Sequence, residues 1–167
     1  MQNRVVVLLG GNLGDRSVTL QHSRMELETE LGTILMKSGI YESAPWGFDT
    51  VVPNFYNQVL VIETVLSPRQ VLKKTQEIEC ALGRVRSLGK GYQSRSIDID
   101  ILFYNDWIVK ENALTLPHAR IASRRFVLVP LAEVLPDFLH PELHCTITAL
   151  LNQCNDPLPV KRVDENE

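Results

Sequence analysis

Two acidic residues alternate with isoleucines at positions 97–101, and this alternation constrains the fold more than any other feature of the chain. Side chains along a β-strand point to opposite faces in turn, so Asp98 and Asp100 share one face, roughly 6 to 7 Å apart. The opposite face, which we expect to point into a core, carries Ile97, Ile99, Ile101 and Phe103. Unpaired carboxylates would be costly there and would repel each other. We therefore expect a positive partner, either Mg²⁺ ions or arginine side chains that form salt bridges.

The length and composition fit one globular domain. A chain of 167 residues suits a single domain over residues 1–167, and its polar end predicts a loose tail at 160–167. The formal net charge of −3 gives no basic field for nucleic acid. No apolar run is long enough to span a bilayer or serve as a signal peptide, so no membrane is expected. Three cysteines argue against a disulfide framework and favour a reducing compartment, so we expect a cytoplasmic protein. We also expect it to be a monomer.

The predicted elements follow the order strand, helix, strand, strand, helix, strand. Strands are expected at residues 5–9, 34–41, 55–63 and at the aspartate segment, with helices starting after Asp15 and after Ser67. This βαββαβ order is that of a ferredoxin-like α+β fold, in which an antiparallel sheet carries both helices on one face. A hairpin partner at 107–109 and helices at 125–134 and 146–152 would cover the other face and complete an α/β/α sandwich.

The segment 83–95 holds four cationic residues and three glycines directly before the aspartates. Arginine offers a planar fork of donors to phosphate oxygens, and glycine lets a loop approach a ligand closely. A solvated surface loop is the alternative, but acids, metal and phosphate form a consistent set that suits phosphoryl transfer. There is no GxxxxGK[ST] loop, and the glycines at 10–14 are more typical of a strand-to-helix turn, although their backbone could face a ligand.

Two histidine-containing segments are weaker candidates. His118 follows a proline, where a histidine is usually only a loop residue, although Thr115 and several arginines lie close to it in the sequence. The segment 140–145 has residue types that bind zinc, but Pro141 disrupts helical spacing and no matching pair lies elsewhere. We therefore do not expect a zinc site.

Four motifs together resemble the 6-hydroxymethyl-7,8-dihydropterin pyrophosphokinase family. They are Gly-Arg-Val-Arg at 83–86, Arg-Ser-Ile-Asp-Ile-Asp-Ile-Leu at 95–102, Leu-Pro-His at 116–118 and Arg-Arg-Phe-Val-Leu at 124–128. The resemblance runs from about Val5 to Pro136. It implies transfer of the β,γ-diphosphate of ATP to the hydroxymethyl group of 6-hydroxymethyl-7,8-dihydropterin, giving AMP and the pterin diphosphate on the route to folate.

The resemblance also implies particular site residues. Asp98 and Asp100 would hold two Mg²⁺ ions against the triphosphate, and Arg84 and Arg95 would act in catalysis from a loop that closes over ATP. The other implied nucleotide contacts are Gln76, Glu79, Arg86, Tyr92, Ile101, Thr115, His118 and Arg124. The implied pterin contacts are the rings of Phe55 and Phe126, the amide of Asn57, and the loop residues Ser43, Ala44 and Trp46. Ala113 and Ala119 depart from the family pattern, and the role of Lys90 is unassigned.

Two other functions fit parts of the pattern. Ferredoxin-like cores with paired aspartates also occur in metal-dependent nucleotidyl transferases and cyclases, which would release pyrophosphate instead of AMP. A non-catalytic binding module of the RNA-recognition type would need a basic sheet face with stacking aromatics, and Asp98 with Asp100 supply the opposite charge.

Overall fold

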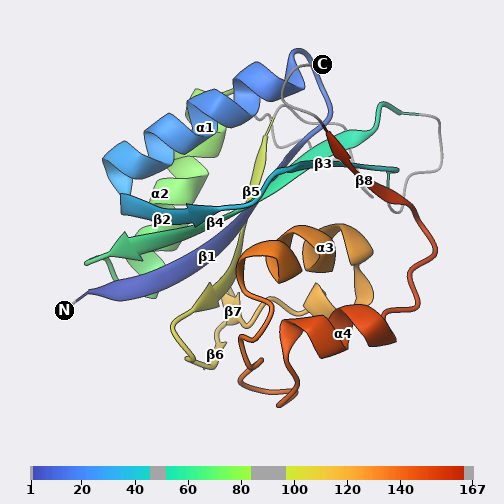
Figure 1. The fold of residues 1–167 in the computed structure, drawn as a ribbon. Coiled ribbons are helices and arrows are strands. Elements are labelled where there is room, and N and C mark those ends of the chain that lie inside the picture. Colours follow the sequence, from blue (N-terminus) through green and yellow to red (C-terminus); the bar gives the residue numbers. More distant parts are fainter. Residues whose placement is uncertain (1, 46–51, 84–96, 164–167) are drawn as a thin grey trace.

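The computed structural model of the chain describes residues 2–45, 52–83 and 97–163 (Figure 1). Its strands are β1 (Asn3–Gly11), β2 (Gly32–Lys37), β3 (Ile40–Ser43), β4 (Phe55–Thr64), β5 (Asp98–Tyr104), β6 (Val109–Lys110), β7 (Thr115–Leu116) and β8 (Val160–Val163). Its helices are α1 (Arg16–Glu30), α2 (Pro68–Ala81), α3 (Arg125–Val134) and α4 (Ile147–Gln153), with a 3₁₀ turn at Ile121–Ser123. None of these helices has the length and apolarity needed to cross a membrane.

The main sheet has the strand order β5-β1-β4-β3-β8, with β2 also paired to β4. All of its pairs are antiparallel, and β1 lies between β4 and β5 over most of its length. The predicted ferredoxin-like βαββαβ arrangement is therefore confirmed. The short strands β6 and β7 form a separate hairpin, close to the partner strand expected at 107–109.

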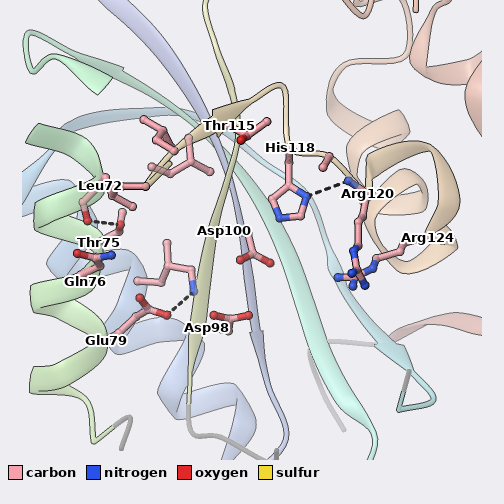
Figure 2. A pocket seen from close by; sticks show the side chains of 15 residues that line it. Leu72, Thr75, Gln76, Glu79, Asp98, Asp100, Thr115, His118, Arg120 and Arg124 are labelled. Atoms are coloured by element: carbon pink, nitrogen blue, oxygen red, sulfur yellow. Dashed lines mark hydrogen bonds between the residues drawn. The ribbon is translucent and has the colours of Figure 1, made fainter. Parts of the chain in front are cut away.

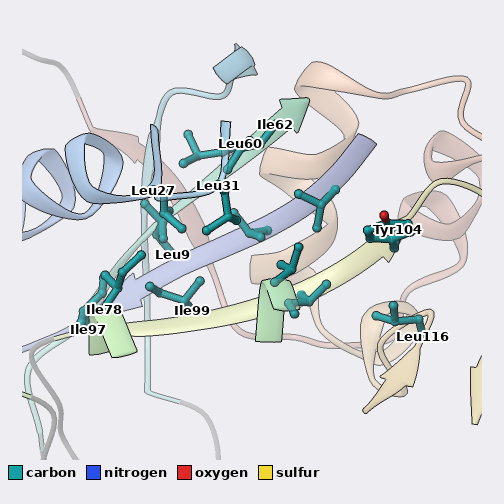
Figure 3. Packing of buried hydrophobic residues seen from close by; sticks show 14 of the residues in the cluster. Leu9, Leu27, Leu31, Leu60, Ile62, Ile78, Ile97, Ile99, Tyr104 and Leu116 are labelled. Carbon is teal, nitrogen blue, oxygen red and sulfur yellow. The ribbon is translucent and has the colours of Figure 1, made fainter. Parts of the chain in front are cut away.

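Helices cover both faces of the sheet, as expected for an α/β/α sandwich (Figure 1). One apolar core lies between the sheet and helices α1 and α2, and Figure 3 shows its buried side chains, among them Leu9, Leu27 and Ile62. A second apolar core lies on the opposite face, where Val127, Leu128 and other residues of α3 and α4 pack. Successive apolar side chains of β1 point to opposite faces of the sheet, so this strand contributes side chains to both cores.

The first two helices begin where the sequence predicts. The Asp15 side chain accepts a hydrogen bond of 3.1 Å from the Val18 N–H at the start of α1. At α2, Ser67 accepts from the Gln70 N–H at 3.3 Å, and the Gln70 side chain accepts from the Ser67 N–H at 2.8 Å. This reciprocal capping box satisfies two backbone donors that no intrahelical carbonyl can reach.

Three sequence-based expectations need correction. The single strand expected at 34–41 is interrupted, because Ser38 and Gly39 separate β2 from β3. There the Gly39 N–H donates to the Glu133 carboxylate of α3 at 2.8 Å instead of to a strand. The tail expected to be loose from residue 160 instead forms β8, which pairs antiparallel with β3. Residues 164–167 lie outside the described part of the chain.

The third correction concerns Phe103. Ile97, Ile99 and Ile101 do point into the core beneath α1 and α2, but Phe103 packs in the core of the opposite face. The register of β5 against β1 shifts at this point, since Val7 pairs with Ile101 and Val6 with Phe103. Leu102 is the extra residue of a β-bulge, and a bulge reverses the faces of the side chains beyond it.

Candidate active site

A pocket of about 480 Å³ opens between α2, β5 and the segment that leads from β7 to α3 (Figure 2). Its volume lies in the range of pockets that hold small ligands. The predicted nucleotide and metal residues that line it are Gln76, Glu79, Asp98, Asp100, Ile101, Thr115, His118 and Arg124. Residues that are far apart in the sequence thus meet at one place, as the resemblance requires.

Asp98 and Asp100 lie on the face of β5 that is turned away from α1 and α2. Both are half-buried, whereas the intervening Ile99 is buried in the opposite core. Figure 2 shows the two carboxylates on the side of β5 that faces His118 and Arg124. The alternation in the sequence therefore sorts the acids into the pocket and the isoleucines into the core.

Glu79 fixes the strand between the two aspartates. It is only 3% exposed, at the end of α2, and its Oε2 accepts a hydrogen bond of 3.2 Å from the Ile99 N–H. This hydrogen bond holds the edge of β5 to the end of α2 at the residue between the two aspartates. Glu79 was expected to contact the nucleotide, and the structure also gives it a structural contact at the wall of the pocket.

His118 presents a neutral ring to the pocket. Burial lowers the pKa of His118, and the nearby Arg124 and Arg120 lower it further, while Asp98 acts in the opposite direction. The ring Nδ1 accepts a hydrogen bond of 3.2 Å from the Arg120 N–H, so the ring proton is on Nε2 (Figure 2). The backbone N–H of His118 donates to Leu102 O at 3.0 Å, which ties this segment to β5. The result is a fixed N–H donor suited to an anionic oxygen.

Arg124 stands at the start of α3 and is 9% exposed. Its guanidinium carbon lies 5.7 Å from the centre of the Phe126 ring, so Arg124 connects the pocket to one of the two rings predicted to hold the pterin. Arg120 and Thr75 also line the pocket, although they were not among the predicted site residues. Arg120 could have been predicted from its place two residues after His118. Nothing in the sequence distinguished Thr75 from the other residues on the apolar face of α2.

Three of the predicted pterin residues, Asn57, Phe55 and Ser43, lie on the same face of the sheet as the aspartates. Asn57 is 2% exposed, and its amide group donates to Ser43 Oγ at 2.8 Å and to Tyr41 O at 3.2 Å. Ser43 in turn pairs with Phe55 across β3 and β4, and Ala44 follows β3 directly. These residues line no wall of the pocket described above; they form a second, adjacent group around Asn57.

Gly10 lies between the two groups. In the register of the sheet it pairs with Asn57 of β4 on one side and with Asp98 of β5 on the other. Neighbouring strands are about 4.8 Å apart, so Asn57 and Asp98 are separated by about 10 Å. A Cβ atom added at Gly10 would lie 3.4 Å from Asn57 Oδ1. Gly10 is itself buried, and its missing side chain leaves no Cβ atom between the amide and the carboxylate.

The two aspartates suit a cation that arrives with a phosphate ligand. Among the residues that the structure describes, no group of three or more His, Cys, Asp or Glu side chains comes together as a metal cage. Mg²⁺ is commonly bound by one or two carboxylates together with substrate phosphates and waters. Asp98 and Asp100, with His118 and Arg124 facing them, supply that kind of incomplete ligand set.

Several predicted site residues lie outside the described residues. They are Trp46, Arg84, Arg86, Tyr92 and Arg95. The catalytic and loop roles expected for these residues therefore stay predictions.

Comparison with known proteins identifies the family. The family model described as 7,8-dihydro-6-hydroxymethylpterin-pyrophosphokinase (HPPK) matches residues 6–136. The chain is 43% identical over 140 residues to a 2-amino-4-hydroxy-6-hydroxymethyldihydropteridine pyrophosphokinase of Porphyromonas gingivalis, a match that covers 83% of this chain and 94% of that protein. A protein of the same name from Methylorubrum extorquens is 39% identical over 137 residues, covering 81% of this chain and 85% of that one.

A solved structure described as HPPK-DHPS in complex with substrates has the same fold. It superposes with a TM-score of 0.74 at 17% identity, over 91% of this chain and 43% of that chain. At this identity the likeness concerns the fold, while the family match and the two relatives rest on sequence. The chain belongs to the 7,8-dihydro-6-hydroxymethylpterin-pyrophosphokinase family.

Proposed function

We propose that the pocket and the adjacent group around Asn57 together carry out the reaction of this family in the present chain. The chain is an ATP-dependent diphosphotransferase of folate biosynthesis. It transfers the β,γ-diphosphate of ATP to the hydroxymethyl group of 6-hydroxymethyl-7,8-dihydropterin and releases AMP. The observation that carries the assignment of residues is the placement of Asn57 and Asp98 on either side of Gly10 on one sheet face.

ATP occupies the pocket between α2 and β5. Gln76, Ile101 and Thr115 line the part of it next to α2 and β7, where the nucleoside would lie. The cationic and neutral donors at the other wall, Arg124 and the His118 ring N–H, face the triphosphate. An arginine fork and a fixed imidazole N–H donate to phosphate oxygens without any need to reorganise during the reaction.

Asp98 and Asp100 hold two Mg²⁺ ions in this proposal. Bound Mg²⁺ would neutralise the charge of the phosphate oxygens and align the triphosphate. The fit rests on the two half-buried carboxylates on one strand face and on the donors opposite them. The Glu79 bond to the Ile99 N–H keeps the spacing of the two carboxylates fixed.

The pterin lies on the group around Asn57. Phe55 and Phe126 provide rings on which a flat heterocycle can stack, and Asn57 with Ser43 and Ala44 provides polar groups at its edge. The amide of Asn57 is already held by Tyr41 O and Ser43 Oγ, so its orientation is set before the substrate binds. Trp46, Arg84, Arg86, Tyr92 and Arg95 complete the site in the proposal by their resemblance to the family.

The chain's contribution to the reaction is alignment. The hydroxymethyl oxygen of a pterin held beside Asn57 reaches across Gly10 towards the β-phosphorus of an ATP held beside Asp98. Holding acceptor and phosphoryl group in line removes much of the entropic cost of their encounter. No covalent intermediate with the protein is required, and the proton of the acceptor hydroxyl leaves with solvent.

We also propose that the enzyme works as a cytoplasmic monomer with one domain. The site is built from elements of one chain, and the three cysteines are unpaired in the structure. Unpaired cysteines are typical of a reducing compartment.

The experiment that tests the function is product analysis with ATP, Mg²⁺ and the hydroxymethyl dihydropterin. Equal amounts of AMP and pterin diphosphate are expected. Free pyrophosphate with a nucleotidylated product would instead indicate a nucleotidyl transferase, and the absence of both products would overturn the assignment.

A further inference from the structure

Helix α3 begins without a cap of its own. Its N-cap residue is Arg124, which makes no side-chain hydrogen bond to the first turn. Ser, Thr, Asp or Asn normally fills this position, because their short side chains accept from the exposed N–H groups. Arginine cannot accept a hydrogen bond, so another group has to satisfy the start of this helix.

Asp156 supplies that group from a segment beyond α4. It is 8% exposed, and its Oδ2 accepts a hydrogen bond of 3.0 Å from the Arg125 N–H, the first N–H of α3. Its Oδ1 accepts from the Leu158 N–H at 3.0 Å, which fixes the carboxylate from its own side. A negative charge at a helix N-terminus also interacts favourably with the helix dipole.

The side chain of Arg125 strengthens the same connection. Its Nε donates to Asp156 O at 3.0 Å, and its terminal nitrogen donates to Cys154 O at 3.0 Å. The other end of α3 is held as well, since Glu133 accepts from the Tyr41 hydroxyl at 2.6 Å and pairs with Arg162 of β8 at 3.3 Å. The chain running from α4 to β8 is thus attached to both ends of α3 (Figure 1).

We propose that Asp156 is a positioning residue for substrate binding, acting through Arg125 on its two neighbours, Arg124 and Phe126. The proposal rests on the proposed function, which places Arg124 at the triphosphate and Phe126 at the pterin. Asp156 takes over the capping role, and this leaves the N-cap position available for an arginine that faces the pocket. Asp156 lies outside residues 6–136, the part of the chain that the family model matches.

The test compares Asp156→Ala with wild type and with Leu150→Ala. Leu150 is a buried residue of α4 in the same layer, and its truncation destabilises that layer while removing none of the hydrogen bonds of Arg125 to Asp156 and Cys154. For each protein, kcat and the KM of ATP and of the pterin are measured well below the melting temperature, together with the Kd of a non-hydrolysable ATP analogue. We expect Asp156→Ala to raise the KM of ATP and the Kd of the analogue by roughly tenfold, because a small displacement of a binding group is costly.

The control separates positioning from stability. Leu150→Ala should lower the melting temperature and leave both KM values within about twofold of wild type. Equal KM values in Asp156→Ala and Leu150→Ala would overturn the proposal. If Asp156→Ala does not fold, Asp156→Glu decides, because its longer side chain keeps the charge but cannot hold the carboxylate in the same place against both the Arg125 and the Leu158 N–H groups. A wild-type KM for ATP in Asp156→Glu would then overturn the proposal. A wild-type protein that releases no AMP would instead contradict the proposed function.

Discussion

The two faces of the sheet differ at one end only. On the face beneath α1 and α2, β1 carries Val5, Val7 and Leu9, all completely buried, so the middle of the strand is apolar on this face. On the opposite face, β1 carries Val6 and Leu8, and the next residue on that face is Gly10.

The neighbouring strands change in the same place. On β4 the apolar Val61 and Val59 give way to Asn57, and on β5 the aspartates replace apolar residues on the face shared with α3. The site is therefore made by exchanging core residues for polar ones at one end of one face. The core beneath α1 and α2 holds the three strands in register, while the polar end of the other face is proposed to bind substrates.

The largest effect should come from the aspartates of the polar end. Replacing Asp98 or Asp100 by Ala should lower kcat/KM by roughly a thousandfold, since the neutralisation of phosphate charge that depends on them is worth several kcal/mol. The free energy of unfolding should change by less than about 1 kcal/mol, because neither side chain belongs to a core. Steady-state kinetics and urea unfolding measure the two quantities. Near-normal turnover in either variant would contradict the metal assignment.

The opposite pattern is expected in the core beneath α1 and α2. Leu60 is completely buried there, so Leu60→Ala should destabilise the protein by about 2–5 kcal/mol through loss of apolar burial and the cavity it leaves. The KM values of the folded protein should stay close to those of wild type. If this variant loses activity while its urea midpoint is unchanged, it is wrong that one face serves stability and the other serves substrate binding.

Much of the fold could be predicted from local patterns. Asp15 and the Ser67–Gln70 capping box specify the helix starts through side-chain hydrogen bonds within four residues. The bulge at Leu102 was not predictable, because the run 101–104 is apolar throughout and its alternation cannot assign faces. β8 was missed for another reason: its polar residues Lys161 and Arg162 join the sheet through backbone bonds to β3, which leave no apolar pattern.

The candidate site was predictable where residues are close in sequence. Asp98 and Asp100 share a face by simple alternation, and the structure confirms that placement. The opposition of Asn57 and Asp98 across Gly10 depends on the register of three strands, which involves pairs far apart in the chain. The contact of Asp156 with Arg125 likewise joins residues from two distant segments. Periodicity within one segment carries no information about such contacts.

A smaller effect should come from filling the gap between the two polar groups. Gly10→Ala would place a methyl group 3.4 Å from Asn57 Oδ1, an ordinary contact that the fold can accept. Because the methyl would stand between Asn57 and Asp98, where the acceptor is proposed to pass, we expect the KM of the pterin to rise by roughly tenfold. The affinity for a non-hydrolysable ATP analogue without pterin, measured by calorimetry, should be unchanged and serves as the internal control. A wild-type KM for the pterin would show that the acceptor does not pass over Gly10.

The smallest effect concerns the apolar end of the sheet face that carries the site, where His140 packs against the core. The His140 ring contacts Phe103 edge to face, and its Nδ1 accepts from the N–H groups of Glu142 and Leu143 at 3.1 Å. Burial lowers the pKa of His140, so the unfolded chain takes up a proton at a higher pH than the folded protein does. This contribution to stability is therefore fully present above about pH 6.5 and is lost as pH falls, by at most about 1.4 kcal/mol per pH unit.

His140→Asn isolates that contribution, because asparagine keeps an acceptor oxygen near the position of Nδ1 and does not titrate. Urea unfolding at about pH 7.5 and about pH 5.5 should show a smaller loss of stability on acidification in the variant than in wild type. The pKa of His118 is lowered as well, so part of the pH dependence should remain in His140→Asn. An identical pH dependence in the two proteins would mean that His140 is not kept neutral by the core. In that case the apolar end of this face would be more accessible to water than the burial of His140 indicates. The difference in water access between the apolar end and the polar end of the face would then be smaller.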